Sequence, residues 1–132
     1  VFPKYQNLQA QADATAAGTS MLAIAKAVNY YQASTGEWPQ DKNRRVLPPE
    51  LEPYLDTNEF EDGPLGGVWD YEDWRGGGNT AGGDEIGIAV SIVEGDPDLY
   101  EAVDAAIDDG DLTTGLVRFC ESSPRLVYIL LF

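Results

Sequence analysis

The sequence predicts an α+β fold, in which a long N-terminal helix packs on an antiparallel sheet of about four strands, with a second, short helix. Three patterns favour it: apolar residues at helical spacing near the N-terminus, alternating or β-branched segments in the second half, and Gly, Pro and Asp between the segments. At 132 residues the chain has the length of one domain. We expect one domain, with a helix at 1–35, a connecting loop at 36–66 and a sheet region at 67–132.

An apolar stripe that repeats every three or four residues predicts the long helix. Its members are Ala14, Ala17, Met21, Ile24, Val28 and Tyr31. Gly36 suits the left-handed residue after a helix, and Pro39 prevents the helix from resuming. Because a helix rises about 1.5 Å per residue, this one exceeds what a small body covers, and we expect residues 2–15 to protrude. In the connecting loop, residues 48–55 favour one or two helical turns that begin with proline.

Alternating residues predict the first strand, at 67–74. The period of two places Asp70, Glu72 and Trp74 on one face, and Trp69, Tyr71 and Asp73 on the other. Three further segments, at 85–93, 116–120 and 125–132, complete the expected sheet. The glycine-rich segment 76–83 lacks the Lys-Ser/Thr ending of a phosphate-binding loop, so we interpret it as the flexible turn of a hairpin.

The second helix is expected at about 98–108, where Leu99, Val103 and Ile107 lie four residues apart. Asp96 suits its N-cap, and Gly110 follows its expected end. Turn-forming residues then lead into the last two strands.

Composition excludes several classes of function. The chain has 23 acidic and 8 basic residues and a formal charge of -15, so we expect no binding to nucleic acid or to anionic membrane surfaces. It contains no histidine, which removes the commonest general base and most zinc sites. Its single cysteine, Cys120, allows no internal disulfide and is expected to be a buried thiol. We predict that the protein is not an enzyme, although acids beside Trp69 and Trp74 are chemically compatible with sugar hydrolysis.

The acidic segment that follows the second helix is a candidate calcium site. Asp108, Asp109 and Asp111, beside Gly110, offer the oxygen ligands that calcium prefers. No glutamate closes the segment as in an EF-hand, so the spacing does not match that motif. The alternative is an ordinary solvated turn, because turns select the same residues.

The first eight residues, Val-Phe-Pro-Lys-Tyr-Gln-Asn-Leu, resemble type IV pilins and type II secretion pseudopilins. They match the point where the membrane-spanning half of the N-terminal helix passes into its soluble half. The resemblance implies an assembly helix that includes Phe2, Pro3, Tyr5 and Leu8. It also implies that a hydrophobic stretch, with a leader-peptidase site and a glutamate, lies upstream of this chain.

Further segments, at 30–39, at 48–55 with 65–71, and at 107–118, are similar to glycine, proline and aromatic patterns of the same family. Many pilins close a C-terminal loop with a disulfide, which lone Cys120 cannot do, so major pilin, minor component and pseudopilin stay open. The resemblance implies an inner membrane-anchored precursor, then a periplasmic or extracellular filament. Its partners would be other subunits and the assembly machinery. The alternative function is a soluble extracytoplasmic calcium- or ligand-binding module.

Overall fold

The computed structural model describes the backbone from Lys4 to Phe132 and the side chains from Leu8 on. Within that part, the chain forms one long helix, short helical segments and a six-stranded antiparallel sheet. The helical elements are α1 (Lys4–Thr35), η1 (Pro49–Leu51), α2 (Thr57–Glu61), η2 (Pro97–Leu99) and α3 (Tyr100–Ile107). The strands are β1 (Val68–Asp73), β2 (Thr80–Ala81), β3 (Asp84–Glu85), β4 (Ile88–Val93), β5 (Val117–Cys120) and β6 (Arg125–Leu131). The predicted α+β class is confirmed.

The sheet order is β1-β4-β6-β5-β2-β3, so the prediction of four strands was wrong by two. The four expected strands are β1, β4, β5 and β6, and the two additional strands, β2 and β3, have two residues each. They form a hairpin in the connection from β1 to β4, and Ala81 pairs with Cys120 on β5. Arg118, which is 7% exposed, holds this hairpin by donating to the Ala81 carbonyl and to Asp84. The glycine-rich segment is therefore partly built into the sheet.

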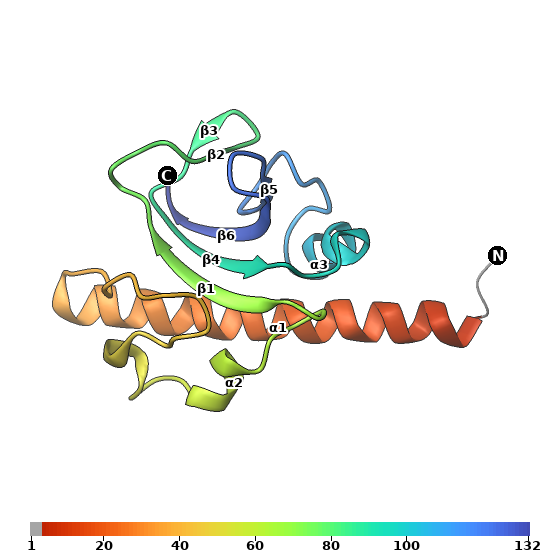
Figure 1. Ribbon diagram of the computed structural model, residues 1–132, viewed down its shortest axis with the longest axis horizontal. Helices are drawn as coiled ribbons and strands as arrows, with labels where there is room; N and C mark the ends of the chain where they lie inside the picture. Colours follow the sequence, from red (N-terminus) through yellow and green to blue (C-terminus); the bar gives the residue numbers. More distant parts are fainter. Residues whose placement is uncertain (1–3) are drawn as a thin grey trace.

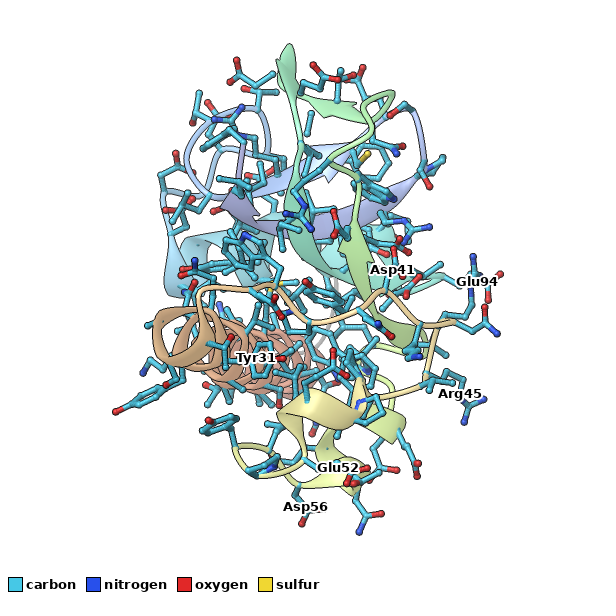
Figure 2. All side chains as sticks on the ribbon, turned by 90° about the vertical axis from the view of Figure 1, so that its left-hand side faces the viewer. Tyr31, Asp41, Arg45, Glu52, Asp56 and Glu94 are labelled. Atoms are coloured by element: carbon cyan, nitrogen blue, oxygen red, sulfur yellow. The ribbon has the colours of Figure 1, made fainter. Side chains whose placement is uncertain are left out.

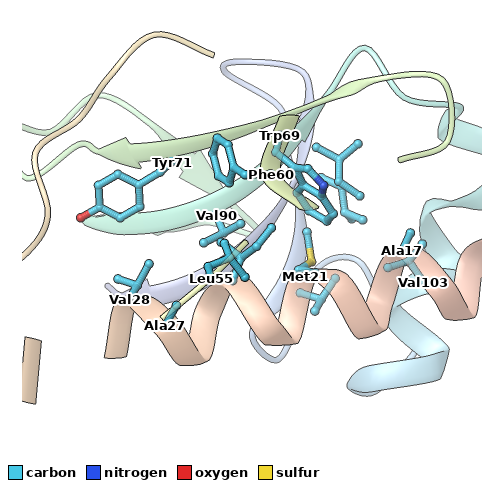
Figure 3. Packing of buried hydrophobic residues seen from close by; sticks show 14 of the residues in the cluster. Ala17, Met21, Ala27, Val28, Leu55, Phe60, Trp69, Tyr71, Val90 and Val103 are labelled. Atoms are coloured by element: carbon cyan, nitrogen blue, oxygen red, sulfur yellow. The ribbon is translucent and has the colours of Figure 1, made fainter. Parts of the chain in front are cut away.

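The apolar stripe of α1 packs against one face of the sheet (Figure 1). Five of its six predicted members are buried, and Tyr31 is half-buried. Met21 points toward Trp69 of β1, and Val28 lies nearer Tyr71 (Figure 3). At the end of α1, Gly36 has a φ of 76° and its N–H donates to the Gln32 carbonyl, as expected for a left-handed helix end.

The connection from α1 to β1 first runs beside β1 and then passes to the other side of α1, below it in Figure 1. It contains η1, at the predicted helical turn, and α2, which the sequence analysis missed. Asp56 caps α2 by accepting from the Asn58 N–H, and Phe60 is fully buried. The same segment covers the free edge of β1, because Arg45 donates its N–H to the Trp69 carbonyl.

The second helix occupies nearly the predicted span, although its first turn is the separate 3-10 segment η2. Asp96 caps η2 by accepting from the Asp98 N–H. α3 packs against α1 where the long helix carries Gly18. A Cβ at Gly18 would lie 2.8 Å from Ile107 Cγ2, so the absent side chain permits this close approach.

We expect Gly18→Leu to lower the free energy of unfolding by about 1–3 kcal/mol, because the larger side chain must displace α3 from α1. Ala12→Leu, on the exposed side of α1, is the matched control and is expected to leave stability unchanged. Urea denaturation of the two variants measures the difference. Equal stabilities would contradict the close packing of the two helices.

Candidate functional site

The N-terminal turns of α1 extend beyond the rest of the molecule (Figure 1). Leu8 is 65% exposed, and the first buried residue of the described side chains is Ala14, at 1%. The predicted protruding segment, residues 2–15, therefore extends too far toward the C-terminus, because Ala14 is already buried and α3 packs beside this part of α1. Phe2 and Pro3 lie outside the described residues.

Tyr5 belongs to the described backbone of α1, but its side chain lies outside the described set. Leu8 is the one predicted assembly residue whose side chain the structure describes, and it faces solvent. None of the helices in the described range is both long enough and apolar enough to cross a membrane.

The acidic loop after α3 brings together two of its three predicted metal ligands. Carboxylate oxygens of Asp108 and Asp109 lie within 4.8 Å of each other and of Asp104, which sequence reasoning missed. Asp111 does not belong to this group. Asp104 is fully buried, and its Oδ2 has no hydrogen-bond partner among the described residues. The position of Asp104 inside the predicted helix gave no separate signal.

Most other oxygens of this loop accept hydrogen bonds from the loop itself. Asp108 Oδ2 accepts from the N–H groups of Leu116 and Val117, at 2.8 and 3.1 Å. The Thr114 hydroxyl donates to Asp109 and lowers the pKa of that carboxyl, whereas burial raises the pKa of Asp104 to about 6. The carboxylates thus stabilise the turn whether or not a cation binds.

Asp111 also serves the turn, because its Oδ1 accepts from both the N–H and the hydroxyl of Thr113. These hydrogen bonds lower the pKa of the Asp111 carboxyl. The hydrogen bonds of Asp111 are therefore those expected of an ordinary solvated turn.

A second group of carboxylates lies at the sheet face that points away from α1. Asp70 and Glu72 of β1 share this face, as the alternation predicted, and both accept from Arg125 Nη1 of β6, at 3.2 and 3.1 Å. The guanidinium of Arg125 also lies 5.3 Å from the centroid of the Trp74 ring. Asp70 is 4% exposed, so the ion pair is largely removed from water.

Asp41 completes this group from the connecting segment, where it runs beside β1 (Figure 2). Its Oδ2 accepts from the Asp73 N–H at 3.0 Å. One carboxylate oxygen from each of Asp41, Asp70 and Glu72 lies within 4.8 Å of the others. We call these three residues the β1 acid cluster.

The surroundings of Asp41 and Glu72 in the β1 acid cluster favour protonation of their carboxyl groups. Burial, and then the neighbouring Asp70 carboxyl, raise the pKa of Glu72 to about 7, although Asp41 and Arg125 lower it. Partial desolvation of its carboxyl group raises the pKa of Asp41 to about 6, although the residue as a whole is exposed and the Asp73 N–H lowers that pKa. On the same strand, Arg75 lowers the pKa of Asp73. The pKa values of Asp41 and Glu72 are therefore raised toward neutrality.

In chelator-containing buffer, we expect the free energy of unfolding to fall as the pH rises from about 5 to about 8. The folded-state pKa values of Asp41 and Glu72 exceed the ordinary 3.8 and 4.5. The stabilisation is thus complete below the ordinary values and is lost as the pH passes the folded-state values. In Glu72→Gln the slope becomes shallower by up to about 1.4 kcal/mol per pH unit.

The exposed change Glu52→Gln is the matched control for this pH series, and its stability curve is expected to run parallel to that of the wild type. Denaturant titrations at each pH provide the measurement. If Glu72→Gln also runs parallel to the wild type, the raised pKa of Glu72 is contradicted.

Sequence reasoning found Asp70 and Glu72 through their period of two but missed Asp41 and Arg125. These two residues come from segments far from β1 in the chain, and no local pattern marks them. Comparisons with protein-family models, with curated proteins and with solved structures found no match to this chain.

Proposed function

We propose that the chain is the globular part of a structural subunit of a type IV pilus or type II secretion pseudopilus filament, assembling through the N-terminal end of α1. The observation that carries this proposal is the mismatch in length between α1 and the sheet. At 32 residues α1 is about 48 Å long, whereas strands of six or seven residues span about 20–23 Å. Among the described side chains, those from Leu8 to Asp13 precede the first buried residue, Ala14, and none of them is buried.

The free end of α1 supports the same proposal through its chemistry. Leu8 is exposed there, and Gln9 bonds to Asp13 along the helix at 2.9 Å, so the polar residues are paired locally. Copies of the chain with a formal charge of -15 repel one another through their surfaces. Helix packing must outweigh this repulsion, which favours helices inside and acidic sheets outside. Repeating one head-to-tail contact then produces an open filament.

We expect Leu8→Asp, placed in the full-length gene product in its own cells, to reduce filament formation at least about tenfold. The change puts a charge at a helix contact, which costs well over the 1.4 kcal/mol that a factor of ten requires. Electron microscopy and pelleting of sheared filaments measure the effect. Melting of the purified domain is expected to be unchanged, because Leu8 is exposed.

Val46→Asp is the matched control, since Val46 is 47% exposed and lies on the connecting segment. Normal assembly of Leu8→Asp would overturn the proposal. The absence of a long apolar run from the sequence encoded immediately before Val1 would overturn it independently.

A calcium-binding module is the second candidate function, and buried Asp104 is the observation that favours it. Its Oδ2 has no hydrogen-bond partner among the described residues, and one of its carboxylate oxygens lies within 4.8 Å of Asp108 and Asp109 oxygens. In a calcium titration by calorimetry, we expect Asp109→Asn to weaken binding at this loop at least about tenfold, because one anionic ligand is lost. Asp111→Asn, outside the group, is the matched control. A titration in which the two variants bind calcium alike would remove this site.

A further inference from the structure

We propose that the β1 acid cluster, Asp41, Asp70 and Glu72, together with the Ser91 hydroxyl, binds a calcium ion that fastens the connecting segment to the edge of the sheet. This site is separate from the acidic loop after α3, and the inference does not depend on the proposed filament function. It concerns a part of the chain that neither candidate function uses.

Ser91 supplies an observation that is independent of the acids. It lies on β4 directly opposite Asp70 in the β1–β4 register, so the two side chains share one sheet face. Ser91 is fully buried, yet its Oγ has no hydrogen-bond partner among the described residues. The same holds for Asp70 Oδ1. Buried polar atoms are nearly always partnered, so two unpartnered oxygens at opposite positions on one sheet face indicate a ligand that binds oxygen.

The spacing of the carboxylates fits calcium. Calcium binds oxygens at about 2.3–2.6 Å, so two oxygens on one ion lie at most about 5 Å apart. The three carboxylate oxygens lie within 4.8 Å of one another. Four protein oxygens leave room for water ligands, and Asp41 lies at the exposed side of the cluster, from which water enters. Magnesium fits less well, because it demands near-octahedral geometry at shorter distances.

The charge balance also favours a divalent cation. Three ionised carboxylates face one guanidinium, that of Arg125, which pairs with Asp70 and Glu72. Asp41 has no ion pair among the side chains described from Leu8 on. One calcium ion added to this set brings its formal charge to zero.

The position of Asp41 indicates what the ion does. Asp41 accepts from the Asp73 N–H, and Arg45 donates to the Trp69 carbonyl, so this short segment pairs with the free edge of β1. An ion shared by Asp41 and the two β1 acids ties that segment to the strand from the side-chain face. Calcium therefore controls how firmly the edge of the sheet is covered.

The test measures amide hydrogen exchange and melting of the purified chain at pH 8, with calcium or with a chelator. We expect calcium to slow exchange of the Asp73 and Arg45 amides by a factor that approaches 1 + [Ca²⁺]/Kd, about 100-fold at 100 Kd. The melting temperature rises in parallel. The variants Asp41→Asn and Glu72→Gln lose both effects, while Asp109→Asn retains them.

Asp41→Asn is the safer variant, because Asp41 is exposed and its amide oxygen still accepts from Asp73. Three outcomes would overturn the inference. They are an absence of slowed exchange with calcium, slowing that survives in Asp41→Asn and Glu72→Gln, and an equal response to magnesium. Slowing that only Asp109→Asn removes would assign the calcium to the loop after α3 instead.

Discussion

Burial of the apolar stripe of α1 against the sheet is the contact on which the other elements depend. Ala14, Ala17 and Ala27 keep the helix surface flat, while Met21 and Ile24 fill the space beneath the sheet. Because small residues lie among the larger ones on this helix, three other parts of the chain approach it closely: α3 on one side, η1 on another and the sheet above (Figure 1). Removing α1 would leave each of these without its apolar partner.

The orientation of the sheet on α1 divides its residues into two unlike faces. Toward α1, alternate residues such as Trp69, Tyr71 and Val90 join the main core. The opposite face mixes a smaller apolar cluster, which includes Ile86 and Cys120, with charged groups. The thiol of Cys120 is buried there, as the sequence predicted. Charges in such a place cost desolvation energy, which the protein offsets by pairing Arg118 and Arg125 of this face with carboxylates.

The filament proposal and the proposed calcium site at the β1 acid cluster use different surfaces of the molecule. The first uses the end of α1 that the body does not cover, and its chemistry is apolar contact between copies. The second uses the sheet face farthest from α1, and its chemistry is ionic. A defect in one leaves the physical basis of the other intact, because no residue of the β1 acid cluster contacts the protruding turns among the interactions described.

The sequence by itself determined the elements whose signal is local. The three-four stripe located α1, the period of two assigned Asp70 and Glu72 to one face, and Asp96 with Gly110 bounded the second helix. Tertiary structure alone decided that the glycine-rich segment pairs with β5, since Arg118 holds it from 37 residues away. It also decided that Asp41 and Arg125 meet the β1 acids. Periodicity indicates which side of a helix or strand is buried, whereas contacts between segments distant in the sequence depend on the topology of the whole fold.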